Sequence, residues 1–103
     1  MHSDLHALRL LAFDAGKTYH AAGTQYFGAV SHRSSEREVS QALEQCIITG
    51  EQYSTALKMY LDGLRNSETN DEVEDLIGRT QRLFDLLNVE LQKFFDLRGK
   101  RRS

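Results

Sequence analysis

The sequence predicts an all-α protein, an antiparallel up-down-up bundle of three long helices. Two observations carry this prediction: none of the 103 residues is proline, and apolar side chains recur at steps of three and four through most of the chain. Proline ordinarily interrupts helices, and the three-and-four spacing places apolar groups on one face of a helix. No stretch shows the sustained apolar and polar alternation of a half-buried strand.

Two short polar stretches, SHRSS at 31–35 and NSETN at 66–70, divide the chain into three segments. Each stretch carries a capping box, a pattern that marks the start of a helix. The boxes are Ser35-x-x-Glu38 and Thr69-x-x-Glu72. A turn of about five residues cannot carry the chain back along a helix of ~40 Å, so consecutive helices must run antiparallel.

We expect one domain over residues 1–97, followed by a basic carboxyl-terminal tail at 98–103. A chain of 103 residues can bury one core but is too short for two. The first segment contains three glycines, each costing about 1 kcal/mol relative to alanine inside a helix. They indicate either a kink near Gly23 or the close approach of a neighbouring helix, and close approach is favoured at Gly16.

Residues 16–26 (GKTYHAAGTQY) have a partial echo at 50–60 (GEQYSTALKMY). Glycine, tyrosine, alanine and tyrosine recur at the same spacing, 34 positions apart. That period is typical of tetratricopeptide repeats, but those repeats contain two helices, and only one helix and one turn separate the two copies here. We therefore interpret the echo as one packing solution used twice, with tyrosine rings in the seam and small residues that allow close contact.

No cluster of residues predicts a reaction. The chain has no phosphate-binding loop, dinucleotide fingerprint, zinc-protease motif or nucleophile elbow. Cys46 falls on an apolar stripe without an activating base, and His2 and His6 share a helix face without further metal ligands. His20 is similar in outline to the histidine of phosphotransfer domains, whose following lysine and serine are missing. We expect no enzyme, no metal and no cofactor.

Charge and cysteine content suggest a cytoplasmic protein that does not bind nucleic acid. The net charge of −2 lacks the basic surface that phosphate neutralisation requires. A single cysteine cannot form an internal disulfide, which favours a reducing compartment. No apolar run reaches the roughly 18 residues of a membrane span, and the amino terminus lacks the positive region of a cleaved signal.

The candidate binding surface lies at the end of the third segment. Three apolar positions there are the hardest for a three-helix core to absorb, and a basic cluster follows them. These residues are Val89, Phe95 and Leu97, then Arg98, Lys100, Arg101 and Arg102. We expect them to bind a protein partner, either a helix or a second copy of the chain, and the basic cluster could also contact an anionic membrane. The alternatives are that the phenylalanines close the core and that the tail is solvated.

Two stretches carry a resemblance to known families. IITGEQYSTALKMYLDGL (47–64) and DEVEDLIGRTQRLFDLLNVEL (71–91) resemble the first two helices of BAR and inverse-BAR domains, and the second stretch is also similar to the last helix of GAT domains. The resemblance covers residues 39–97. It implies a non-enzymatic interaction or dimerisation module of an adaptor or scaffold in membrane trafficking or cytoskeletal organisation.

A bacterial origin offers a different function. Helical proteins of this length are common among secretion-system chaperones and secreted helical hairpins, so such a role is the alternative. The WXG family places its tryptophan motif near mid-chain, where this sequence has Ile48-Thr49-Gly50. The family match therefore fails at its defining residue.

Overall fold

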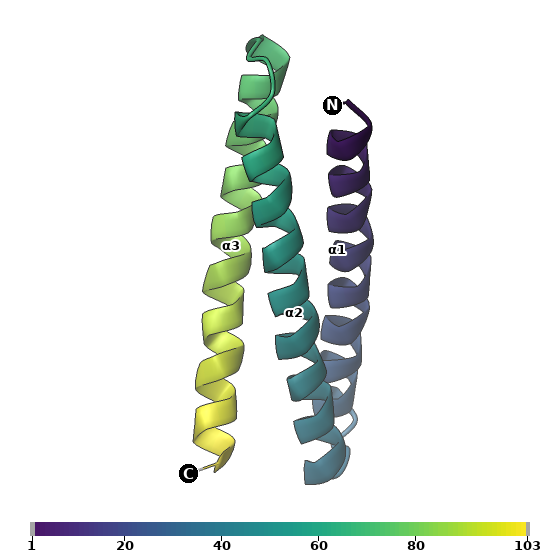
Figure 1. The fold of residues 1–103 in the computed structure, drawn as a ribbon. Helices are drawn as coiled ribbons and strands as arrows, with labels where there is room; N and C mark the ends of the chain where they lie inside the picture. The colour runs from purple at the N-terminus through teal and green to yellow at the C-terminus, as the bar shows by residue number, and fades with distance from the viewer. Residues whose placement is uncertain (1, 103) are drawn as a thin grey trace.

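The computed structural model describes residues 2–102, and the side chains of residues 4–101 within them. The chain forms helix α1 (His2–Ser31), helix α2 (Glu36–Arg65) and helix α3 (Asp71–Arg102), joined by short turns. Consecutive helices run antiparallel, down, up and down in the view of Figure 1, and the molecule measures 51 × 21 × 18 Å. This confirms the all-α, antiparallel prediction. Among the described residues, no helix combines the length and hydrophobicity needed to cross a membrane.

The helix starts follow from side chains that cap free backbone amides. The Ser35 hydroxyl accepts a hydrogen bond from the Glu38 amide at 3.2 Å, as predicted for α2. At α3 the Asn70 side chain accepts from the Val73 amide at 2.9 Å. The cap of α3 is therefore one residue later than the predicted Thr69, because asparagine is at least as good a cap as threonine.

Helix α2 lies between the other two helices (Figure 1). Within residues 2–102, α1 and α3 each pack against α2, but no Cα atom of one comes within 8 Å of a Cα atom of the other. A compact trio would bring all three helices into contact at interaxial distances of about 8–10 Å. We interpret this arrangement as three positions of a four-helix bundle, with α1 and α3 on its diagonal.

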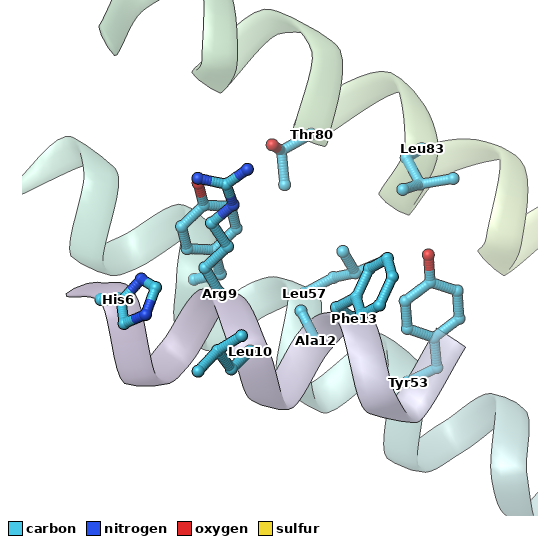
Figure 2. A pocket seen from close by; sticks show the side chains of 10 residues that line it. His6, Arg9, Leu10, Ala12, Phe13, Tyr53, Leu57, Thr80 and Leu83 are labelled. Atoms are coloured by element: carbon cyan, nitrogen blue, oxygen red, sulfur yellow. The ribbon is translucent and has the colours of Figure 1, made fainter. Parts of the chain in front are cut away.

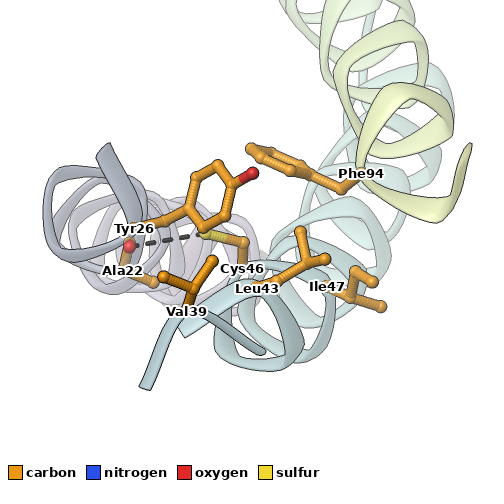
Figure 3. Packing of buried hydrophobic residues seen from close by; sticks show 7 residues of the cluster. All are labelled: Ala22, Tyr26, Val39, Leu43, Cys46, Ile47 and Phe94. Atoms are coloured by element: carbon orange, nitrogen blue, oxygen red, sulfur yellow. Dashed lines mark hydrogen bonds between the residues drawn. The ribbon is translucent and has the colours of Figure 1, made fainter. Parts of the chain in front are cut away.

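Aromatic rings span the diagonal at the end where α1 finishes and α2 begins (Figure 3). The rings of Tyr26 on α1 and Phe94 on α3 meet edge to face, with centroids 5.8 Å apart and planes at 89°. Leu43 and Ile47 of α2 lie beneath them and are almost fully buried. Edge-to-face contact is a favoured aromatic geometry, so these side chains join α1 to α3 without close backbone packing.

The echoed stretches pack against each other reciprocally. A Cβ atom on Gly16 would lie 2.9 Å from Cζ of Tyr53, and one on Gly50 would lie 3.0 Å from Cε1 of Tyr19. Each glycine thus makes room for the tyrosine ring of the other stretch, and the two ring centroids are 6.0 Å apart. This confirms one packing solution used twice, related by an approximate two-fold axis between α1 and α2.

Glycines outside this seam behave differently. A Cβ atom on Gly23 would have no neighbour within 4 Å, so close packing does not explain this residue. Helix α1 nevertheless continues through it without a break. Close approach is therefore confirmed at Gly16, and the alternative of a break near Gly23 is not what the structure shows.

Candidate functional site

An apolar groove runs between α1 and α3, with α2 as its floor. Figure 2 shows its section near the start of α1, where side chains from all three helices surround an open space of about 460 Å³. The walls and floor there include Leu10, Phe13, Tyr53, Leu57, Thr80 and Leu83. The groove exists because the backbones of α1 and α3 do not pack together within residues 2–102, and the Tyr26–Phe94 contact joins the two helices only toward the other end of the bundle.

The groove continues toward the other end of the bundle. Tyr53 borders both sections, and the second one is lined by Gly23 and Phe27 of α1 and by Glu90 of α3. Tyr19 donates a hydrogen bond of 2.6 Å to Oε1 of Glu90 across the base of this section. A carboxylate thus lies at mid-groove, and the same section is lined by glycines, aromatic rings, His20 and Thr24.

Large apolar side chains of the groove remain open to solvent. Phe13 is 60% exposed and Phe27 is 63% exposed, while Leu83 on the opposite wall is 43% exposed. Exposed large apolar side chains that line a groove commonly mark an interaction site. These residues give the described part of the molecule its candidate functional surface.

The approximate two-fold axis between α1 and α2 relates the groove-facing side of α1 to the side of α2 that packs against α3. Subtracting 34 from Ile47, Gly50 and Leu57 of α2 gives Phe13, Gly16 and Gly23 of α1. On α2 these positions receive α3, because Leu91 presses against Gly50, and Ile47 and Leu57 share clusters with α3 side chains. On α1 the matching face borders the groove. Helix α1 thus has a face equivalent to the one that α2 uses to bind α3.

Both tyrosines at the base of the groove are held in the protonated form. Burial raises the pKa of Tyr19, and its hydrogen bond to the Glu90 carboxylate raises it further. Burial also raises the pKa of Tyr53. An un-ionised phenol is a hydrogen-bond donor with an apolar ring, so these side chains can pack beneath an apolar partner and donate at its edge.

The histidines do not assemble a metal site in the described part of the chain. Among those residues, no three His, Cys, Asp or Glu side chains lie close enough together to hold a metal ion. His6 borders the groove, whereas the side chain of His2 lies outside the described residues. His20 is exposed on the α1 wall of the groove.

Cys46 is fully buried in the core near the α1–α2 turn. Its Sγ donates to the backbone carbonyl of Ala22 at 3.4 Å (Figure 3). Burial raises the pKa of the Cys46 thiol from 9.0 to about 11. The thiol is therefore packed as a small apolar group, as the sequence predicts.

We expect Cys46 to resist thiol reagents in the folded protein. At pH 8 the native chain should react with dithionitrobenzoate at least about 100-fold more slowly than the chain in 6 M guanidinium, because the thiolate is the reactive form and the sulfur is inaccessible. The unfolded chain loses the thiol proton first, so the stability that this group contributes falls as the pH rises from about 9 to about 11. Equal native and denatured rates would contradict the buried placement.

The apolar residues predicted to bind a partner do not form one surface. Val89 is 56% exposed and Leu97 is 37% exposed, but Phe95 is half-buried and packs against both core clusters. Six residues separate Val89 from Phe95, which places them about 120° apart around the helix. Phe95 therefore belongs largely to the core, the alternative that the sequence left open.

The basic residues predicted as a tail form the last turns of α3, which runs to Arg102. The Arg98 guanidinium lies 3.4 Å from Oε2 of Glu44 and 5.0 Å from the centre of the Phe95 ring. Arg101 pairs with Glu36. Lys100 is exposed, and the side chain of Arg102 lies outside the described residues. The domain thus extends beyond Leu97, and two of the arginines join α3 to α2.

Phe13 and Phe27 were not among the sequence-predicted site residues. A signal for them exists in the charge distribution: α1 carries only four charged residues, Asp4, Arg9, Asp14 and Lys17. None of the residues from Thr18 to Ser31 is charged. A helix with apolar residues on all sides is typical of a buried position, which α1 does not occupy within this single chain.

Comparison with protein-family models, with curated proteins and with solved structures gives no match to this chain. The feature that this chain itself offers is the α1–α3 groove.

Proposed function

We propose that the protein is a non-enzymatic helical interaction module, a component of an adaptor or scaffold, that binds an amphipathic helix in the α1–α3 groove. One observation carries the proposal: in the described residues the backbones of α1 and α3 pack against α2 but not against each other, and exposed apolar side chains border the space between them. Recognition of a helix by an apolar groove is a common mode of protein association. A bound helix would complete the bundle.

The groove has the shape that a helix requires. Its two sections follow one another along α1 and α3, so the apolar lining extends over several helical turns. Phe13 and Leu83 rise from opposite walls and would flank the bound helix, while the open space at Gly23 allows close approach on the α1 side. Anchor residues at spacings of three and four on the bound helix would meet this lining.

A small-molecule site is a weaker reading of the same surface. The section around Phe13 has a volume of about 460 Å³, within the range of ligand pockets. Such pockets usually enclose their ligand and place several polar groups to orient it. This section is open along its length and is lined mainly by apolar and aromatic side chains (Figure 2), which favours another helix as the ligand.

The cellular setting of the proposal comes from the resemblance of residues 39–97 to BAR and GAT domains. That resemblance assigns the module to membrane trafficking or cytoskeletal organisation in the cytoplasm. The antiparallel arrangement of three long helices agrees with a helical adaptor domain. The groove itself supports helix binding in any setting.

Site-specific photo-crosslinking in cells of the source organism tests the proposal. We expect a benzoylphenylalanine residue at Phe13 to crosslink to a protein under ultraviolet light, because a partner helix would lie against that ring. The matched control carries the same residue at Leu11, which is 56% exposed and lines a different surface of α1. Mass spectrometry of the product identifies the crosslinked protein.

The position of the crosslink decides the result. A strong product from Phe13 with little from Leu11 supports helix binding in the groove. Equal products from both positions would show indiscriminate contact, and the absence of any product from Phe13 would show that the groove stays empty in the cell. Either of these outcomes contradicts the proposed function.

A further inference from the structure

We propose that the groove binds a helix of another protein that carries an acidic residue, a leucine and an aromatic residue in the order acid-leucine-x-x-aromatic. The aromatic ring fills the open space of Figure 2. This inference rests on the proposed function, because it names the chemistry of the partner in the same groove. The template is α3 itself, in which Glu90, Leu91 and Phe94 have this order and make the corresponding contacts beside α2.

The open space of Figure 2 is the counterpart of the site that the Phe94 ring occupies. Phe94 meets Tyr19 and Tyr26 edge to face and shares a cluster with Cys46 and Ile47. The approximate two-fold axis relates each position of α1 to the position 34 residues later in α2. The counterparts of these four neighbours all line the open space, and they are Tyr53, Tyr60, Ala12 and Phe13. The chain thus contains one aromatic site twice, once filled by Phe94 and once open.

The hydroxyl of Tyr53 gives the position of the acid. Tyr19 donates a hydrogen bond of 2.6 Å to Oε1 of Glu90, and the counterpart of Tyr19 is Tyr53. Among the described residues the Tyr53 hydroxyl has no hydrogen-bond partner, and it points into the groove (Figure 2). A carboxylate on the bound helix would accept a hydrogen bond from Tyr53, as Glu90 does from Tyr19.

The leucine follows from the glycine of the echoed stretch. Leu91 comes directly after Glu90 and lies against Gly50, where it occupies the space that a Cβ atom would need. The counterpart of Gly50 is Gly16, where the nearest neighbours of an added Cβ atom are all atoms of Tyr53. The groove side of Gly16 is therefore free to receive a leucine of the bound helix. The acid then stands one residue before this leucine and the aromatic residue three residues after it.

The same axis gives the direction of the bound helix. Helices α1 and α3 run in the same direction (Figure 1). A two-fold axis that relates the antiparallel helices α1 and α2 reverses the direction of α3, so the counterpart of α3 runs antiparallel to both walls of the groove. This is the direction of a fourth helix in an alternating bundle.

The charge of the α1 wall also favours an acidic helix. Arg9 lines the open space, and Nζ of Lys17 lies 4.6 Å from the centre of the Phe13 ring. No carboxylate of α1 lines either section of the groove in the described residues. Complementary charges across an interface favour the correct partner, so acidic side chains beside the apolar stripe of the bound helix would meet these two cations.

The partner is another protein because two-fold symmetry cannot bring a second copy of this chain into the groove. An axis that placed α3 of the second copy there would coincide with the approximate axis between α1 and α2, and the two α1–α2 pairs would overlap. An axis that placed α1 or α2 of the second copy there would bring the other of these two helices to the place of α3. Homodimers are ordinarily two-fold symmetric, so the groove requires a different chain.

Binding of a synthetic α3 peptide to the full chain tests the proposal. A peptide of residues 80–97 contains Glu90, Leu91 and Phe94 in the proposed order. We expect the fluorescently labelled peptide to bind the chain with a dissociation constant below about 0.1 mM by anisotropy titration. Replacing Phe94 of the peptide with alanine should weaken binding at least about tenfold, because buried aromatic anchors dominate such contacts.

Variants of the chain locate the bound peptide. Phe13→Glu should weaken binding at least about tenfold, because it places a carboxylate in an apolar contact. Leu11→Glu, at an equally exposed position outside the groove, should leave binding unchanged. Circular dichroism confirms that each variant keeps its helix content.

A double-mutant cycle tests the contact between the tyrosine and the acid. Glu90→Ala in the peptide should weaken binding several-fold, and Tyr53→Phe in the chain should remove most of this difference. Tyr19→Phe is the matched control, since Tyr19 contacts Glu90 of the chain's own α3. A difference that disappears with Tyr19→Phe instead would show that the peptide has replaced α3.

The outcomes separate this inference from the proposed function. The proposed ligand is wrong if the peptide shows no saturable binding, if binding does not respond to Phe13→Glu or to the loss of the Phe94 ring, or if the acid couples to Tyr19. If Phe13 nevertheless photo-crosslinks to a protein in cells, helix binding stands and the ligand has another sequence. If Phe13 crosslinks to nothing, both proposals fail.

Discussion

Replacing Phe94 with alanine is expected to lower the free energy of unfolding by about 3–5 kcal/mol, the range for truncation of a buried phenylalanine. Phe94 is 7% exposed, and its ring meets Tyr26 at 5.8 Å and Tyr19 at 6.4 Å between centroids. Since α1 and α3 have no close backbone contact in the described residues, the loss removes much of what joins them. Urea unfolding followed by circular dichroism measures the change.

Leu86→Ala provides the control on the same helix. Leu86 is 65% exposed, so its truncation should change the free energy of unfolding by no more than about 0.5 kcal/mol. A Phe94→Ala protein as stable as Leu86→Ala would show that the aromatic contacts contribute little. In that case α1 and α3 would be held only through their separate contacts with α2.

The helices could be predicted from the sequence because their determinants are local. Apolar spacing, the absence of proline and the polar breaks act within a few residues of each position. The shift of the α3 cap from Thr69 to Asn70 shows the limit of this reasoning, since two adjacent residues can both cap a helix and the preference between them is small. The reciprocal packing of Gly16 with Tyr53 was also visible as a repeated spacing.

The position of α3 could not be predicted in the same way. Whether α1 and α3 touch depends on how deeply side chains of α2 and the rings of Tyr26 and Phe94 fill the space between them. The burial of Phe95 depends on the same packing, because a small rotation of α3 about its axis would move this side chain from the core to the surface. Apolar periodicity identifies the buried face of a helix but does not fix that rotation.

The groove residues lie outside the stripe that defines the core face of α1. Ala12, Tyr19 and Tyr26 follow that stripe and are buried or half-buried, whereas Phe13 and Phe27 fall beside it. Phe13 and Phe27 are large apolar residues outside the core-facing stripe of a helix with few charges, and this pattern was not used to predict a site from the sequence. They indicate a second buried face, which is why the α1–α3 groove is interpreted as a docking surface.

Gly50 and Leu91 are expected to be strongly coupled in stability. Leu91→Ala alone should lower the free energy of unfolding by about 2–5 kcal/mol, because Leu91 is 4% exposed and its truncation leaves a cavity between α2 and α3. Gly50→Ala alone should lower the free energy of unfolding by about 0–2 kcal/mol. The new methyl group collides with Leu91 and lies 3.0 Å from the Tyr19 ring. The higher helix propensity of alanine, worth about 1 kcal/mol, offsets part of this strain.

The double variant should lose about 1–2 kcal/mol less than the sum of the two single losses, because the methyl group introduced by Gly50→Ala then occupies space that Leu91 has vacated. A double-mutant cycle by urea unfolding measures this coupling.

Gly23→Ala is the control, because a Cβ atom there meets nothing within 4 Å. This variant should raise the free energy of unfolding by up to about 1 kcal/mol, and its effect should simply add to that of Leu91→Ala. If the losses from Gly50→Ala and Leu91→Ala add to within about 0.5 kcal/mol, α3 does not press against Gly50. The equivalence between this face of α2 and the open face of α1 would then have no support.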